Sequence, residues 1–295
     1  MSAKDSLLYV VTVIIWGSTW IGIKFQLGTV DPMISVVYRF ALSSVILLVF
    51  CKLRGLTLIF SFRDHVFMGL LGLLLFSVNY WLVYVAEVHL TSGLVAVLFS
   101  SIVFMNIANG ALFLGAPVER KMVLGAVVGI MGIGLIFMHE IESFALTDKN
   151  LMGVAFGFTS VLLASLGNIT SARNSRNNIP VIQANAFGMG YGALALAVLA
   201  LILGKEFDFS MTLPYVTSLL YLAVFGSIIA FTSYLTLIRS LGADKASYSI
   251  MVVPVVALLI SSLVEGYVWS FSAITGLILV VGGNFLALHR PTTAA

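Results

Sequence analysis

Arg39 is a cation inside an apolar stretch, residues 32–51, that is long enough to cross a membrane as a helix. It follows Asp31 by eight residues, which places it about 12 Å along a helix at 1.5 Å per residue. A charge at that depth is costly unless it meets a polar partner or a wet cavity. Two interpretations stay open. Arg39 contacts an anion such as a substrate carboxylate, or it fastens helices by bonding carbonyls, water or the hydroxyls of Ser35 and Tyr38.

Lys24 is the second cation within such a stretch, residues 6–28, about five residues from its end. From there a lysine stem reaches the membrane surface. Lys24 therefore either belongs to a solute pathway or anchors the surface, with Glu87 as one candidate partner.

Uncharged polar residues within the apolar stretches are weaker site candidates than the two cations. Amides are the stronger members, because an unpaired amide in hydrocarbon is costly, whereas hydroxyls often bond their own backbone. We predict that these residues line a cavity, with helix–helix packing as the alternative. The set is Ser18, Thr19, Asn79, Tyr80, Ser100, Ser101, Asn106, Asn168, Tyr234, Tyr248 and Ser249.

Trp16 and Pro254 complete the predicted site. Trp16 lies too deep for an interfacial aromatic belt, so it either fills the core or walls the cavity. Pro254, in the middle of an apolar stretch, frees backbone carbonyls, and such breaks are tolerated where packing or a cavity supplies partners. The residues just before it, from Ser249 to Val253, are therefore expected to line the cavity.

Several chemistries lack the residues that they need. No Asp or Glu lies within an apolar stretch, and the four histidines all lie at stretch edges. The sequence has no phosphate-binding Gly-Lys loop and no cluster of metal-ligating residues, and Cys51 is its one cysteine. We therefore expect no cofactor, no metal, no ATP hydrolysis and no enzyme activity.

The elements that must position these residues are ten apolar stretches. Hydrophobic residues make up 60% of the chain and charged residues 9%, against roughly a quarter charged in a soluble domain. About 20 apolar residues span the bilayer as a helix, so we predict an all-α polytopic membrane protein with ten transmembrane helices. The stretches are residues 6–28, 32–51, 65–86, 91–115, 122–139, 151–172, 180–203, 213–238, 246–264 and 270–289.

The charges between the stretches sort by side. One side holds Lys4, Lys52, Arg54, Arg63, Arg120, Lys121, Arg173, Arg176, Arg239, Lys245 and Arg290. The other holds Lys149 and Lys205 with Asp31, Glu87, Glu140, Glu142, Asp148, Glu206, Asp208 and Glu265. Cationic short loops stay in the cytoplasm, so both termini are predicted to be cytoplasmic. No soluble basic cluster suggests a nucleic-acid partner.

The two halves share residue spacings. Gly72 precedes Tyr80 by eight residues, as Gly226 precedes Tyr234, and the Gly125–Gly132 spacing recurs at Gly276–Gly283. Pro32 and Pro180 each open a second helix of a half. A duplicated unit with an odd number of spans enters the membrane in opposite senses, so we predict two inverted five-helix repeats.

Four motifs resemble the drug/metabolite transporter superfamily and its EamA-type repeat. They are WGSTW at 16–20 with Lys24 one turn on, Pro32 with YRFALSS at 38–44, LIRSLGADKASYS at 237–249 running into Pro254, and the Gly276–Gly283 helix. The resemblance covers essentially the whole chain, as repeats at residues 1–142 and 143–295. The family's Gly-Glu pair is replaced by Ala116-Pro117 and Tyr267-Val268, and the fourth stretch has no proline matching Pro254.

Within that superfamily the chain looks most like bacterial exporters of aromatic and other amino acids. The resemblance implies export of amino acids across the cell inner membrane by alternating access, by a monomer or a homodimer in the lipid bilayer. The lack of a titratable group at depth favours facilitated transport or exchange over obligate proton coupling. The alternatives are export of other metabolites or drugs, nucleotide-sugar or triose-phosphate exchange, an intramembrane lipid-modifying enzyme and a membrane scaffold.

Overall fold

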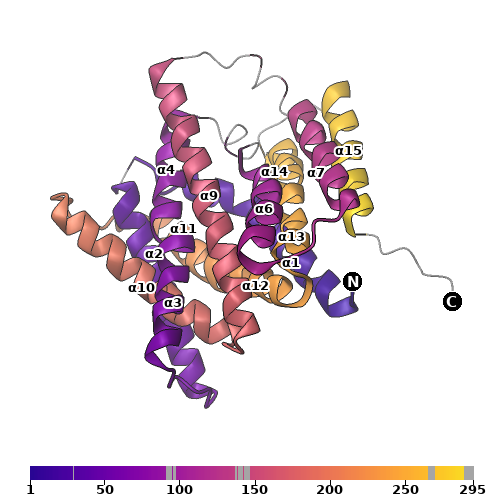
Figure 1. Ribbon diagram of the computed structural model, residues 1–295. Helices are drawn as coiled ribbons and strands as arrows, with labels where there is room; N and C mark the ends of the chain where they lie inside the picture. Colours follow the sequence, from indigo (N-terminus) through magenta and orange to yellow (C-terminus); the bar gives the residue numbers. More distant parts are fainter. Residues whose placement is uncertain are drawn as a thin grey trace.

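The computed structural model describes residues 1–28, 30–90, 95, 98–136, 138, 142, 147–264 and 270–288, and every regular element in those ranges is a helix. The helices pack as one bundle (Figure 1). In chain order they are α1 (Ala3–Lys24), α2 (Pro32–Leu53), α3 (Phe62–Leu75), α4 (Val78–His89), α6 (Ile102–Leu114), α7 (Arg120–Ile136), α9 (Asp148–Arg176), α10 (Val181–Ile202), α11 (Leu213–Tyr221), the π-helix η1 (Leu222–Ile229), α12 (Ala230–Leu241), α13 (Ala243–Ala246), α14 (Tyr248–Val264) and α15 (Phe271–Leu288).

Each predicted apolar stretch contains a described helix, but not every one of these helices is long and apolar enough to cross a membrane. Six helical ranges are long and apolar enough to cross a membrane, and a seventh, Leu98–Leu114, is shorter. The six are Pro32–Leu53, Phe62–His89, Asp148–Arg176, Val181–Ile202, Leu213–Leu241 and Phe271–Leu288. Helices α7 and α14 have 17 residues each. The start of the fourth predicted stretch, at residues 91–94, lies outside the described residues.

Two of the predicted spans are less regular than the sequence suggests. The third is interrupted at Phe76 and Ser77, where Ser77 has φ −132° and ψ −106°. The eighth continues from α11 through a π-helical segment, Leu222–Ile229, into α12. Both are the third spans of their halves. Irregular backbone at membrane depth is tolerated where it is buried in protein or lines a cavity, and π-helical turns are frequent at functional sites.

Helix starts follow from local sequence. Ser2 and Ser61 begin α1 and α3 with reciprocal capping boxes, in which Asp5 and Asp64 return the hydrogen bond. Asp31 caps α2 through the Met33 amide, and the predicted proline is the first residue of that helix. These caps lie at helix ends, where backbone amides have no partner within the helix.

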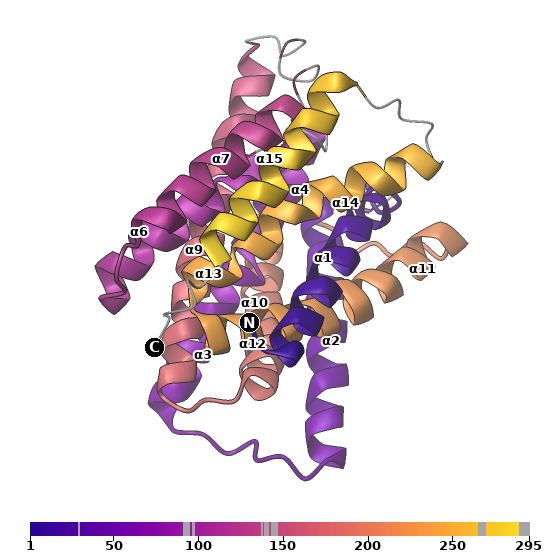
Figure 2. The same ribbon diagram turned by 90° about the vertical axis from the view of Figure 1, so that its right-hand side faces the viewer.

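The packing of the two halves is related by an exchange of equivalent helices. Helix α4 packs on α9, and its counterpart α12 packs on α1. Likewise α1 packs on α14, and α9 packs on α6. Equivalent helices of the two halves also pack on each other, α2 with α10 and α7 with α15. Both views show α7 and α15 lying side by side (Figures 1 and 2). The bundle therefore has a two-repeat architecture.

The repeated glycines explain the contact between α7 and α15. A Cβ on Gly125 would lie 2.6 Å from the Gly283 carbonyl oxygen, and a Cβ on Gly132 would lie 2.6 Å from that of Gly276. Real Cβ atoms do not come that close, so the two backbones touch only because these residues are glycine. The matched spacing seen in the sequence is thus the matched spacing of one interface.

The outside of the bundle is apolar. Leu112 on α6, Leu194 on α10 and Ile278 on α15 are 75%, 63% and 65% exposed. A water-facing surface rarely carries large apolar side chains over so many elements. Together with the long apolar helices, this surface identifies a multi-pass membrane protein.

Candidate functional site

A cavity lies in the middle of the bundle between the two halves. Its walls come from α1, α2, α3, α4 and α6 in the first half and from α9, α12 and α14 in the second. It offers about 90 Å³ of space to the centres of water molecules. One water needs about 10–15 Å³ on that measure, so the cavity has room for several waters or a small solute.

The cavity gathers most of the residues predicted from the sequence. They come from segments far apart in the chain, and they meet because the helices pack through the exchanged contacts described above. The lining includes Trp16, Thr19, Arg39, Asn79, Tyr80, Asn168, Tyr234 and Pro254. Ile250 and Val253, which precede Pro254, also line it.

Six of the predicted site residues lie away from the lining, and one of them, Asn106, donates to the Ala243 carbonyl oxygen. The Ser18 hydroxyl donates to the Ile15 carbonyl oxygen and contacts the Tyr221 hydroxyl, and those of Ser101 and Ser249 donate to Leu98 and Ala246. Tyr248 donates to the Met122 carbonyl, and Ser100 is buried elsewhere. The hydroxyls of the first three serines bond carbonyls of their own segments, as such groups often do. The Lys24 side chain is outside the described part of the chain.

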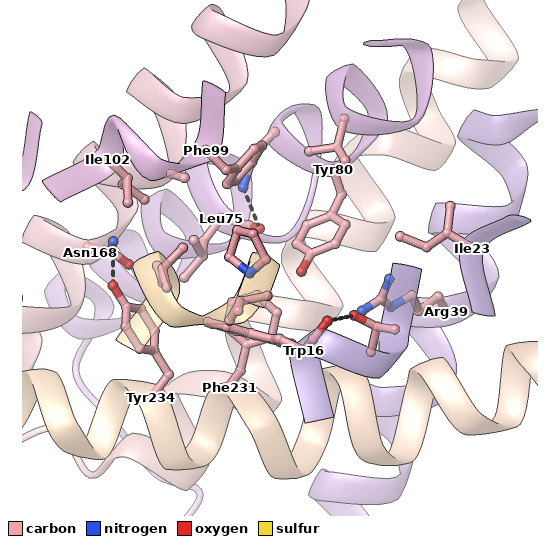
Figure 3. Close-up of a pocket in the computed structure, with 17 residues that line it drawn as sticks. Trp16, Ile23, Arg39, Leu75, Tyr80, Phe99, Ile102, Asn168, Phe231 and Tyr234 are labelled. Atoms are coloured by element: carbon pink, nitrogen blue, oxygen red, sulfur yellow. Dashed lines mark hydrogen bonds between the residues drawn. The ribbon is translucent and has the colours of Figure 1, made fainter. Parts of the chain in front are cut away.

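Arg39 is 1% exposed and sits at one edge of the cavity (Figure 3). Its Nε donates to the Ser227 hydroxyl at 2.9 Å, and its guanidinium carbon lies 4.7 Å from the ring centre of Tyr80 and 5.3 Å from that of Phe40. Nη1 is buried and has no hydrogen-bond partner. An unsatisfied buried donor costs about 1–3 kcal/mol, and more when it is charged.

The hydroxyls that the sequence suggested for Arg39 are engaged elsewhere. Ser35 lies 3.1 Å from the Tyr215 hydroxyl, and Tyr38 donates to the Phe207 carbonyl oxygen at 3.0 Å. That expectation was wrong, because the Arg39 side chain points away from both hydroxyls and toward the second half of the chain. Its partner, Ser227, lies in η1 and was not foreseen.

The π-helical segment shapes the Arg39 end of the cavity. The Gly226 carbonyl accepts from Trp16 Nε1 at 3.1 Å, and the Ser227 hydroxyl donates to the Leu222 carbonyl oxygen at 3.0 Å. A Cβ on Gly226 would lie 3.0 Å from Thr19 Cγ2 and 3.1 Å from Arg39 Nη2. A glycine at this position therefore lets α1 and α2 approach the segment together.

Asn168 and Tyr234 form the other end of the cavity. Asn168 Nδ2 donates to the Tyr234 hydroxyl at 3.0 Å and to Asn106 Oδ1 at 3.4 Å, and Asn106 Nδ2 donates to the Ala243 carbonyl oxygen at 3.2 Å. The bond to that carbonyl fixes which Asn106 atom is nitrogen, and so requires the facing Asn168 atom to be a donor. Asn168 Oδ1 is left buried without a partner.

Aromatic rings form the walls between the two ends. Trp16 lies 5.0 Å from both Phe231 and Tyr234, measured between ring centres, and Phe231 lies 5.9 Å from Tyr80. Figure 3 shows Arg39 and Asn168 at opposite ends of the lining residues, with Trp16 and Phe231 between them. The site is thus a short aromatic slot with a cation at one end and an amide at the other.

Some lining residues were not foreseen. Phe231 stands three residues before Tyr234, so both lie on one face of α12, and that spacing was the available signal. Phe99, Val83 and Ile23 also line the cavity, but apolar residues in an apolar stretch carry no distinguishing pattern. Asn79 is a lining residue whose amide is used structurally, because its Oδ1 accepts from Ser160 at 2.7 Å.

Comparison with known proteins agrees with this architecture. The family model described as the EamA-like transporter family matches residues 4–138 and again residues 151–288. The chain is 30% identical over 291 residues to YedA of Escherichia coli K12, named as an uncharacterized inner membrane transporter, covering 95% of this chain and 92% of that protein. It is 22% identical over 283 residues to protein PagO of Salmonella typhimurium LT2, covering 96% of this chain and 92% of that protein.

A crystal structure with 16% sequence identity superposes with a TM-score of 0.79 and covers 98% of this chain and 97% of its own chain. At that identity the likeness concerns the fold alone. The double family match covers nearly the whole chain, and one relative reaches 30% identity over almost all of it. The chain therefore belongs to the EamA-like transporter family, within the drug/metabolite transporter superfamily, and is a membrane transporter.

Proposed function

We propose that the protein is a secondary carrier that exports neutral and aromatic amino acids, with broad specificity, from the cytoplasm by alternating access. The observation that carries the proposal is the mid-bundle cavity, which both repeats line with a cation, amides and aromatic rings. Substrate sites of repeat-built carriers lie near the midplane at the repeat interface. The cavity of this chain lies between the two repeats, which agrees with such a site.

We further propose ten spans in two inverted repeats, residues 1–142 and 143–295, in the inner membrane with both termini in the cytoplasm. An odd number of spans in each repeat reverses the second copy, and the exchanged helix contacts agree with such a pair. The cationic loops on one side support the orientation. The name of YedA, an inner membrane transporter, supports the location.

Polar contacts join the two halves on both sides of the bundle. On the proposed cytoplasmic side, Arg176 donates to the Leu114 carbonyl oxygen at 2.9 Å, and Glu119 pairs with Lys245 at 3.4 Å. On the other side, Lys205 lies 2.7 Å from Asp31. Opening to one compartment would break one set of contacts while the other set holds.

The lining favours amino acids over phosphate esters. Flat aromatic walls suit side chains of varied size, and the amides suit polar ones. A phosphate ester or nucleotide sugar carries two or more negative charges and calls for several cations, whereas Arg39 is the one cation of the described lining. Drugs and other small metabolites fit the same walls and remain the second candidate class. A lipid-modifying enzyme would need a titratable pair, and the described lining holds no carboxylate and no histidine.

The test is flux in proteoliposomes. Purified protein should move labelled neutral amino acids down their gradients without ATP. The Ala164→Trp variant, which fills the cavity, should abolish flux, while Leu194→Trp on the lipid-facing surface should not; Ala164 lines the cavity and Leu194 is 63% exposed. No flux for any member of a broad amino-acid panel would contradict the proposal. Flux of a labelled drug or other small metabolite instead would identify the second class.

A further inference from the structure

Arg39 uses only part of its bonding capacity within the protein. Nε is bonded to Ser227, and the guanidinium plane lies against the rings of Tyr80 and Phe40. No ion pair joins Arg39 to an acidic residue in the described part of the chain. Nη1 is buried and unbonded in a residue that lines the cavity. A fixed, desolvated cation with an unbonded nitrogen is suited to pair with an anion.

We propose that Arg39 Nη1 binds the carboxylate of a monocarboxylate substrate. The proposal rests on the transport function above and names the group that its cavity recognises. A carboxylate supplies the charge and the acceptor that Nη1 lacks, and charge-assisted hydrogen bonds of this kind are short and strong. A single cation balances a single negative charge, so a carboxylate fits better than a phosphate dianion.

The surroundings fix how such a substrate lies. The far end of the slot, at Asn168 and Tyr234, is uncharged, and the Asn168 amide nitrogen already donates to Asn106 and to the Tyr234 hydroxyl. The carboxylate therefore points to Arg39, and the uncharged part of the substrate lies along Trp16 and Phe231 toward Asn168. Ser227 is a positioning residue, because its hydroxyl holds Nε and leaves Nη1 as the free edge.

The first experiment compares acids with their amides on the unmodified protein. Uptake of labelled L-phenylalanine into proteoliposomes is competed with unlabelled L-phenylalanine, L-phenylalaninamide and 3-phenylpropionate. A charged hydrogen bond corresponds to about tenfold or more in affinity, so the two acids should compete about tenfold better than the amide. Uptake with equal competition by acid and amide would overturn this proposal while leaving the transport function intact.

A second readout does not depend on transport. The melting temperature of the purified protein is measured with a panel of amino acids and their carboxamides. The acids should stabilise the protein, because a ligand that binds only the folded state raises its melting temperature, and the amides should not. Absence of flux together with acid-selective stabilisation would contradict amino-acid export but not this inference. No stabilisation by any acid would overturn the inference.

The variants assign the selectivity to one side chain. Arg39→Gln should abolish the acid-over-amide preference, and the matched control Arg54→Gln should keep it, because Arg54 is exposed at the end of the same helix. A folded Arg39→Gln protein that still prefers acids would overturn the proposal. If that variant does not fold, Ser227→Ala decides, because it releases Nε without removing the charge. It should reduce the acid-over-amide ratio about threefold, and an unchanged ratio would contradict the proposal.

Discussion

The two ends of the cavity meet the cost of burying polar groups in different ways. At one end, Arg39 bonds Ser227 and lies against two aromatic rings, and no carboxylate of the described residues pairs with its charge. At the other end, Asn168, Asn106 and Tyr234 share a chain of hydrogen bonds that finishes on the Ala243 carbonyl oxygen. One end holds an uncompensated charge, and the other holds a neutral network.

The difference indicates a division of roles. The neutral network joins α6, α9, α12 and α13, and so ties the two halves together near the proposed cytoplasmic side. Its loss should therefore weaken the fold. The Arg39 end should contribute little to the stability of the fold, because it buries a charge whose Nη1 has no hydrogen-bond partner. Its loss should affect binding.

The largest effect is expected from Arg39→Gln. Transport of labelled amino acid should fall by about tenfold to a hundredfold, because the substrate loses a charged hydrogen bond of about 1.5–3 kcal/mol. The melting temperature should change little, since the variant removes a buried cation together with one hydrogen bond. Proteoliposome flux and thermal unfolding of one preparation measure both quantities. A collapse of the fold would instead show that Arg39 fastens the helices.

Asn168→Leu should have the opposite effect, a loss of stability that is larger than its effect on transport. It leaves Asn106 Oδ1 without its donor and removes the bond to Tyr234, so unfolding should become easier by about 1–3 kcal/mol. Asn109→Leu is the matched control on α6, because the Asn109 amide makes one hydrogen bond, at 2.9 Å to Ser165, and is only half-buried. Equal melting temperatures for the two variants would remove the distinction between the ends.

The sequence predicts the chemistry of the cavity better than its detailed contacts. Arg39, Asn168 and the equivalent tyrosines Tyr80 and Tyr234 were all foreseen, because a charge, an amide or a repeated tyrosine in an apolar helix stands out. The hydroxyls of Ser18, Ser101 and Ser249 were misplaced. A serine in a helix bonds its own carbonyls wherever it faces, so its presence does not indicate a direction.

The irregular third spans were beyond the reach of hydropathy. The break at Phe76 and Ser77 and the π-helical segment before Ala230 leave the apolar pattern unchanged. They redirect side chains by a fraction of a turn, which is how Ser227 comes to face Arg39. The spacing of Gly72 and Gly226 indicated a repeat. The close contacts that require glycine at these two positions come from other helices, so they cannot be predicted before the helices are packed. Packing decides such detail after the helices exist.

Gly226→Ala tests how closely the Arg39 end is fitted. The new Cβ would lie 3.1 Å from Arg39 Nη2 and 3.0 Å from Thr19 Cγ2, which is tighter than ordinary contact. Overpacking of this kind costs about 1–3 kcal/mol, and displacement of Arg39 should reduce the acid-over-amide preference severalfold. Gly134→Ala is the control, because nothing lies within 4 Å of its Cβ position. Equal selectivity in both variants would mean that Arg39 tolerates displacement.

The smallest effect concerns a surface link beside the neutral network. Glu119, which precedes α7, pairs with Lys121 at 3.1 Å and with Lys245 of α13 at 3.4 Å. The hydrogen bond from Lys121 and the charge of Lys245 hold the pKa of Glu119 below its ordinary value of 4.5, although partial burial opposes them. Because the folded pKa is the lower one, the stabilisation is present above pH 4.5 and is lost as the pH falls through the folded value.

Glu119→Gln should therefore lower the melting temperature slightly at pH 7. The free energy of unfolding should fall by less than about 1 kcal/mol, because the pair is exposed. The difference from the unmodified protein should shrink as the pH falls below 4.5, because Glu119 then becomes protonated and loses its charge, and it should also shrink at 1 M salt, where the screening length falls to about 3 Å. Selectivity for acids over amides should not change, since Glu119 lies outside the cavity lining. A selectivity change would show that the link across the halves also sets the geometry at Arg39, and would remove the independence of the two ends.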